Sequence, residues 1–183
     1  MYIAQQKKQE NIAEYVLYMF QIEDVIRAYQ FNVDQILEQY VKPQFPDESY
    51  LNQYREWYQG LVRSMQSQRI EKSGHVSEVL EVLVELSYLH NTLINITKDQ
   101  KYLQLFEAAM PFIDEFKDKS NLKDKNIIEI AFNALYMKLL LRLQKKEISA
   151  ETEEAFDAMR ILLAYLAKVF HQMRNGTFDF SQN

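Results

Sequence analysis

The chain contains 183 residues, of which 48% are hydrophobic, and it carries a net charge of −5 at pH 7. The absence of cysteine excludes disulfides, a thiol nucleophile and cysteine-ligated metals. A negative net charge of mixed signs provides no basic surface of the kind that binds nucleic acid or an anionic membrane, so we expect neither as a partner.

The composition also predicts the fold class. Three glycines and three prolines leave few turns, and abundant Leu, Glu, Lys, Gln and Ala favour helix over strand. A chain of this length suits one domain, which buries about 70% of the surface that its unfolded form exposes. We predict an all-α fold, a single globular bundle of six or seven helices over residues 1–176 with a C-terminal tail over 177–183. The N-terminal residues lack the apolar core of a secretion signal, so we expect a cytoplasmic location.

Four helices are predicted in the first half of the chain, from apolar residues that recur at i, i+3 and i+4 spacing. Asn32 has the position of an N-cap for the second helix, which Pro43 and Pro46 end. The expected helices cover residues 5–29, 33–41, 47 or 49 to 69, and 75–95.

Three further helices are predicted in the second half. Thr97 and Gln100 have the spacing of a capping box that opens the fifth helix, and Pro111 within it is expected to kink the helix or split it in two. Ser149 is the expected N-cap of the last helix and Gly176 its left-handed terminator. In the tail, Phe178 and Phe180 are candidates to dock back onto the bundle. The expected helices cover residues 98–117, 127 to about 146, and 150–175.

The stretch Ile127–Leu143 is the expected centre of the bundle. A helix that is hydrophobic nearly all round is normally buried, and this one is too short and too charged to span a bilayer. At 100° per residue, Glu129 and Asn133 share one side, and Lys138 and Arg142 lie on the opposite side. Either the solvent-exposed face of the helix changes halfway along it, or one of these pairs is buried and finds its polar partners inside the protein.

Four stretches of the chain carry a family resemblance. Residues 4–8, 11–15, 21–28 and 140–149 read Ala-Gln-Gln-Lys-Lys, Asn-Ile-Ala-Glu-Tyr, Gln-Ile-Glu-Asp-Val-Ile-Arg-Ala and Leu-Leu-Arg-Leu-Gln-Lys-Lys-Glu-Ile-Ser. In these stretches and in length the chain resembles an uncharacterised family of short Bacteroidetes proteins, a domain of unknown function. The resemblance implies a helical fold and a bacterial cytoplasm. It brings no activity, cofactor or catalytic residue.

No sequence motif indicates a metal, a cofactor or a catalytic centre. Ferritin-like di-iron bundles use Glu-x-x-His on two helices, and none of the three histidines follows a glutamate by three positions. A site built of carboxylates alone is the remaining alternative for a metal. A glycine-rich phosphate loop and a nucleophile elbow are both missing from the sequence. We therefore expect no cofactor and no metal, and the sequence leans against an enzyme.

Five polar residues are the candidates for a ligand site. Arg142 lies on the helix expected to be buried and would need a carboxylate partner, for which Glu23 and Asp24 are candidates. The functional alternative is an anion-binding pocket that uses Arg142 with Lys138. His90 lies on an apolar helix face, where it is either a general base in a cleft or, the favoured interpretation, a core histidine hydrogen-bonded to backbone.

Glu23, Asp24 and Arg27 lie within one turn of the first predicted helix. Two carboxylates can serve in acid–base chemistry when their pKa values are pushed apart. Adjacent helical residues point about 100° apart, however, so Glu23 and Asp24 do not naturally share a site. The favoured interpretation is an ordinary ion pair between Glu23 and Arg27.

An aromatic stripe on the third predicted helix consists of Tyr54, Trp57 and Tyr58. Tryptophan and tyrosine are frequent interface anchors, so the stripe is a candidate partner surface; core packing is the favoured alternative. The leading hypothesis is a non-enzymatic protein that acts through protein–protein interaction, with a homodimer as one form. The second hypothesis is a small-molecule or anion-binding helical protein with a pocket near Arg142.

Overall fold

The computed structural model describes residues 2–45 and 48–178, and in these ranges it contains α-helices and no strand. The all-α prediction is confirmed, with eight α-helices in the described ranges where six or seven were expected. None of the described helices is long and apolar enough to cross a membrane. The helices are α1 (Tyr2–Glu10), α2 (Ile12–Ala28), α3 (Val33–Ile36), α4 (Leu51–Ser67), α5 (Ser77–Asn95), α6 (Gln100–Lys119), α7 (Ile127–Leu143) and α8 (Ala150–Arg174).

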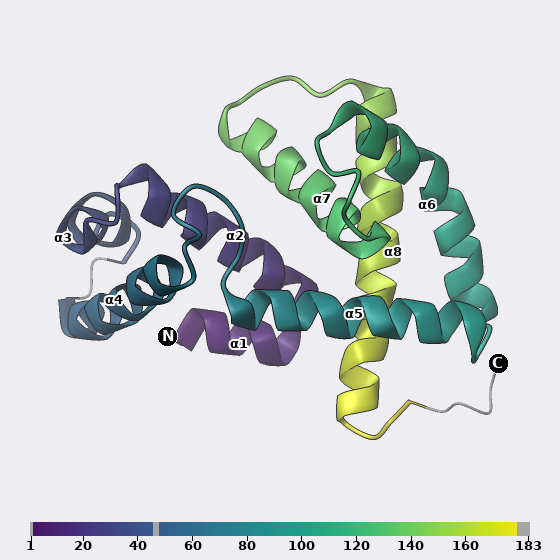
Figure 1. Ribbon diagram of the computed structural model, residues 1–183, viewed down its shortest axis with the longest axis horizontal. Coiled ribbons are helices and arrows are strands. Elements are labelled where there is room, and N and C mark those ends of the chain that lie inside the picture. Colours follow the sequence, from purple (N-terminus) through teal and green to yellow (C-terminus); the bar gives the residue numbers. More distant parts are fainter. Residues whose placement is uncertain (1, 46–47, 179–183) are drawn as a thin grey trace.

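The longest helix, α8, organises the C-terminal part of the bundle. Figure 1 shows α6 and α7 on either side of α8, with α5 crossing it, and each of these helices contacts α8. The shorter helices α3 and α4 lie together at the other end of the molecule, where they contact each other and α2. Helix α2 also contacts α5, α7 and α8, so it joins the two ends.

The central position of α7 is confirmed for most of its length. Helices α2, α5, α6 and α8 all contact it, and side chains such as Ile130 and Phe132 are fully buried. The last turn emerges from the bundle, where Leu143 is 60% exposed. Lys138 and Arg142 therefore differ in exposure: Lys138 is buried, whereas Arg142 belongs to the exposed end.

The first helix is interrupted, contrary to the prediction of one helix from Gln5 to Tyr29. Asn11 adopts an extended conformation with φ −152° and separates α1 from α2. Its side-chain oxygen accepts hydrogen bonds from the backbone N–H groups of Ala13 and Glu14, as an N-cap does. The cap stabilises the break because it satisfies N–H groups that a new helix leaves without partners.

The other helix ends follow the sequence signals with two corrections. Asn32 caps α3 through the N–H of Gln35, and Ser149 caps α8, as predicted. Asp99, not Thr97, caps α6, and α6 continues through Pro111 without a split. The chain leaves α8 through Gly176 at φ +67°, the predicted left-handed terminator.

Two further segments complete the description of the chain ends and the first half. The short helix after Asn32 continues beyond α3 as a π-helix, Leu37–Val41, and a 3-10 turn, Glu48–Tyr50, precedes α4. Phe178 packs against the core, as expected, and Phe180 lies outside the described residues.

Candidate functional site

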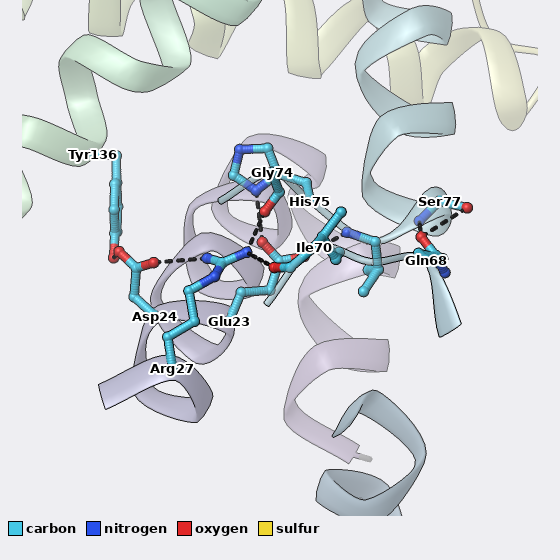
Figure 2. Close-up of polar contacts among 10 residues, drawn as sticks. Glu23, Asp24, Arg27, Gln68, Ile70, Gly74, His75, Ser77 and Tyr136 are labelled. Atoms are coloured by element: carbon cyan, nitrogen blue, oxygen red, sulfur yellow. Dashed lines mark hydrogen bonds and ion pairs between the residues drawn. The ribbon is translucent and has the colours of Figure 1, made fainter. Parts of the chain in front are cut away.

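Glu23 on α2 has a fully buried side chain that nevertheless carries a carboxylate. One oxygen, Oε1, accepts a hydrogen bond from the backbone N–H of Val76 at 2.8 Å, and Oε2 lies 2.6 Å from Nδ1 of His75. The His75 ring stacks on Phe20, also on α2, with ring centroids 3.7 Å apart. Both oxygens therefore have partners, as a buried carboxylate requires. Figure 2 shows the Glu23 carboxylate and the His75 ring meeting at the loop that precedes α5.

Arg27, one turn after Glu23, binds the backbone of the same loop. Its guanidinium donates to the carbonyl oxygen of Ile70 at 3.2 Å and to that of Gly74. It also pairs with Asp24, at 2.8 Å. The predicted Glu23–Arg27 ion pair is therefore wrong, because the Glu23 carboxylate turns toward the loop and Asp24 takes its place.

Asp24 connects this group to the central helix. The hydroxyl of Tyr136 on α7 donates to Oδ2 of Asp24 at 2.7 Å, while Oδ1 binds Arg27. Burial, together with the hydrogen bond to Asp24, raises the pKa of Tyr136, so the phenol keeps its proton and remains a donor. Glu23, Asp24, Arg27, His75 and Tyr136 form one connected group, which we call the loop cluster.

The loop cluster fixes where α5 begins. Val76, the N-cap residue of α5, has no side-chain oxygen to accept from the first helical N–H groups. Side chains outside α5 accept instead. Gln68 accepts from the N–H of Ser77 at 2.9 Å, and Glu23 accepts from the N–H of Val76 itself. Glu23 and His75 line none of the three hollows described below. The geometry assigns the cluster a structural role.

Lys138, rather than Arg142, is the buried cation of α7. Its side chain is 9% exposed, and Nζ lies 2.6 Å from Glu153 and 3.1 Å from Asp157, both on α8. Hydrogen bonding to Lys138 lowers the pKa of Glu153, and hydrogen bonding to Arg160 and to Lys138 lowers that of Asp157. Lys138 thereby supplies the internal salt bridge that joins two helices.

Arg142 does not lie where the sequence predicted. Its side chain is 61% exposed and reaches Glu153 at 3.3 Å, so the expected partners Glu23 and Asp24 are wrong. The reason is that α7 leaves the bundle in its last turn and faces α8 there, while both α2 carboxylates belong to the loop cluster. Beside Arg142 and Lys138 lies a hollow of about 470 Å³, whose walls also include Asp157.

His90 is a core histidine with a side-chain partner. Its Nδ1 lies 2.7 Å from the hydroxyl oxygen of Tyr102, in place of the backbone partner that was expected. Burial lowers the pKa of His90 to about 4, so the ring is neutral at pH 7. Its neighbour Tyr102 donates its backbone N–H to Asp99, which also accepts from the hydroxyl of Tyr165 at 2.9 Å.

The aromatic stripe packs inward. Tyr58 is 1% exposed and Tyr54 is 8% exposed, so neither offers a surface to a partner, and core packing is the correct interpretation for both. Trp57 is half-buried, and its ring stacks against Tyr18 and meets Tyr58 edge-on. Within the described residues, no group of three or more histidine and carboxylate side chains is arranged to hold a metal ion.

Exposed apolar side chains lie instead along a groove between α5 and α8. Val84 is 66% exposed, Tyr88 is 71% exposed and Met173 is 40% exposed. The groove has a volume of about 720 Å³, and Glu85 and Arg174 form a 2.8 Å ion pair at its side. Its walls are Val84, Glu85, Tyr88, Leu89, Thr92, Phe170, Met173 and Arg174.

Residues 1–177 match a family model described as "Domain of unknown function (DUF4924)". The chain belongs to this family. The match confirms that the resemblance at both ends of the chain is to an uncharacterised family of unknown function. No curated protein and no solved structure is significantly similar to the chain.

Sequence reasoning missed two features of this DUF4924 chain. The loop cluster joins residues about 50 positions apart, and no periodic pattern reveals such a pair. The groove did leave a signal, because Val84 and Tyr88, which line it, continue a row of every fourth residue that starts at Leu80 on α5. That row makes the apolar face of α5 wider than the neighbouring helices cover.

Proposed function

We propose that this protein acts through non-enzymatic protein–protein association, and that two copies pair through the groove between α5 and α8. The observation that carries the proposal is the exposed apolar row of Leu80, Val84 and Tyr88, beside Met173 of α8. Contiguous exposed apolar patches mark interaction sites more often than scattered apolar residues do. The proposal places the protein in a bacterial cytoplasm, as the family resemblance implies.

The charges at the side of the groove favour a second copy of the chain as its occupant. Glu85 and Arg174 are each about half exposed, at 50% and 49%, so the groove presents one anion and one cation at its side. In a twofold dimer the same patch meets itself, and residues away from the axis face a different residue of the partner. A patch with both signs is complementary to its own copy, although each chain carries a net charge of −5.

The expected affinity is modest. Four partly exposed apolar side chains from each of two copies supply on the order of 10 kcal/mol on burial. That gain is similar to the cost of lost translational and rotational freedom, about 4–15 kcal/mol. The gain exceeds the low end of this cost by about 6 kcal/mol at most, so we expect a weak dimer that dissociates at tens of micromolar or above.

Sedimentation equilibrium over a wide concentration range tests the proposal. The wild type should show a concentration-dependent dimer, and Val84→Glu should be monomeric because it places a charge in the middle of the apolar row. Leu143→Glu is the matched control, since Leu143 is a similarly exposed apolar residue, 60% exposed, at the end of α7. Circular dichroism confirms that each variant is folded.

Two outcomes would overturn this proposal. A wild type that stays monomeric at every concentration removes it, and so does a Leu143→Glu variant that dissociates as fully as Val84→Glu. A charge exchange, Glu85→Arg with Arg174→Glu, adds a further test. It keeps both signs and should preserve the dimer.

Binding of an anion or a small molecule beside Arg142 is a second candidate function. It is favoured by the hollow of about 470 Å³ that Arg142 and Lys138 line with apolar residues of α2, α7 and α8. It ranks second because Glu153 and Asp157 already neutralise the cations. An Arg142→Met variant that stays stable and loses a ligand retained by the wild type in native mass spectrometry would support it.

A further inference from the structure

A third hollow, of about 530 Å³, lies between α1 and the C-terminal end of α8. Unlike the hollow beside Arg142, it has no acidic residue in its walls, although the chain as a whole is acidic. Its walls carry amide and cationic groups and one imidazole. They are Gln5, Lys8, Gln9, His171, Arg174 and Asn175.

The proton of His171 is placed by a contact with the backbone. The N–H of Ile12, at the start of α2, donates to Nε2 of His171 at 3.0 Å. Because Nε2 uses its lone pair as an acceptor, the neutral ring must carry its proton on Nδ1. Within residues 2–45 and 48–178, Nδ1 of His171 has no hydrogen-bond partner. His171 therefore keeps one N–H donor that the fold does not use.

Burial, and then the nearby charge of Arg174, lowers the pKa of His171. The ring consequently stays neutral at pH 7, and the bond from Ile12 persists. Positive charge in the hollow comes instead from Lys8 and Arg174. These two side chains are positioned over aromatic rings, with Lys8 Nζ 5.2 Å from the ring centroid of Tyr15 and the Arg174 guanidinium 4.6 Å from that of Phe170.

Arg174 keeps donors to spare. One of its terminal nitrogens pairs with Glu85, and a guanidinium has five N–H groups in all. The C-terminal end of a helix would by itself repel an anion. Here, however, backbone N–H groups of Asn175, Gly176 and Thr177 cap the last carbonyl oxygens of α8. The cap reduces that repulsion.

We propose that this hollow binds a phosphate group, held by the charges of Lys8 and Arg174 and oriented by the Nδ1–H of His171. Glu85 offsets part of the charge of Arg174, whereas Lys8 forms no ion pair within the described residues. A phosphate suits this arrangement because its oxygens accept from N–H donors in several directions. The carboxamides of Gln5 and Gln9 supply further donors beside it. The proposal is independent of dimerisation, although Arg174 lines both hollows.

Titration with inorganic phosphate, followed by nitrogen–proton correlation NMR at constant ionic strength, tests the proposal. Saturable shifts are expected at the amide of Ile12 and at the ring nitrogens of His171. A parallel titration with glycerol 3-phosphate distinguishes the sources of the group. Equal affinity identifies free phosphate as sufficient, and tighter binding of the ester identifies a phosphorylated small molecule.

Lys8→Gln should weaken binding on the order of tenfold, because one of the two cations is lost. Lys7→Gln is the matched control, since the adjacent lysine pairs with Glu14 at 2.8 Å and does not line this hollow. His171→Gln should retain binding, because a carboxamide both accepts from Ile12 and donates. His171→Phe should lose it, with thermal unfolding used to confirm that the variant is folded.

The proposal is overturned if phosphate produces no saturable shift, or if Lys7→Gln weakens binding as much as Lys8→Gln does. The second result would indicate diffuse attraction to the cationic face of α1. The Val84→Glu variant should bind phosphate like the wild type. The proposed dimer and the proposed phosphate site can therefore be refuted independently of each other.

Discussion

The carboxylate of Glu23 and the imidazole of His75 meet 2.6 Å apart, although 52 positions separate them in the sequence. The same carboxylate accepts the backbone N–H of Val76, so a single side chain of α2 holds the residues from which α5 starts. Arg27 adds two bonds from its guanidinium to carbonyl oxygens of the loop. The position of α5, and with it the groove, depends on these contacts.

Replacing Glu23 with Ala should destabilise the protein by about 3 kcal/mol, because the buried N–H of Val76 and the partly buried ring of His75 lose their partner. The loop between α4 and α5 should also open more often. Limited trypsin digestion measures that opening by cleavage after Arg69 and Lys72, and urea unfolding measures the stability. Glu81→Ala, at an exposed position on α5, is the control and should match the wild type. A Glu23→Ala variant as resistant to trypsin as the control would contradict the proposed anchoring.

The neutral state of His90 makes stability depend on pH. Its pKa is lowered from 6.5 to about 4 by burial, so the unfolded chain binds the proton more tightly than the folded protein does. The contribution is therefore complete above pH 6.5 and is lost as the pH falls toward the folded pKa. At 1.36 kcal/mol per unit, it amounts to about 3 kcal/mol.

A His90→Gln variant should show a flatter loss of stability between pH 6.5 and pH 4 than the wild type does. Urea unfolding at several pH values gives both slopes. The comparison is needed because His171 also has a lowered pKa and acts in the same direction in both proteins. Identical slopes in wild type and variant would show that His90 does not titrate in this range.

Local signals in the sequence predicted the helices well and their contacts poorly. Asn32 and Ser149 cap helices as expected because capping depends on neighbouring residues alone. Asn11 was missed although Glu14 stands three positions later, because residues 5–10 are glutamine, lysine and glutamate, which favour a continuing helix, and no glycine or proline marks a break. Here capping outweighed helix propensity.

The partners of the candidate site residues could not be predicted from the sequence. The sequence indicated that a cation of α7 needs a carboxylate, and one does, but Lys138 is the buried cation and α8 supplies the partners. Helical periodicity places both residues on one side of the helix. It does not say at which residue the helix leaves the bundle. The partners of Glu23 were equally hidden, since they lie in a loop.

Replacing Asn11 with Ala should cost about 1 kcal/mol, the usual effect of removing an N-cap. The N–H groups of Ala13 and Glu14 would lose their acceptor. Asn11→Asp is the matched control, because it keeps the acceptor and adds a negative charge at a helix N-terminus, where it is favourable. Urea unfolding should rank Asn11→Asp at or above the wild type. If both variants lost equal stability, capping would not explain the break between α1 and α2.

Lys138 and Arg142 should differ in their contributions to stability, in the reverse of the order expected from the sequence. Arg142→Met should change the free energy of unfolding by no more than about 0.5 kcal/mol, as exposed substitutions usually do. Lys138→Met should cost more, because it removes the buried cation between Glu153 and Asp157. The pKa values of both carboxylates are lowered in the fold, so their contribution is present above their unfolded pKa and is lost as the pH falls. The deficit of Lys138→Met should therefore be large at pH 7 and shrink toward pH 3. A deficit that stays constant over this range would mean that Lys138 stabilises the bundle through the packing of its methylene chain and not through its charge.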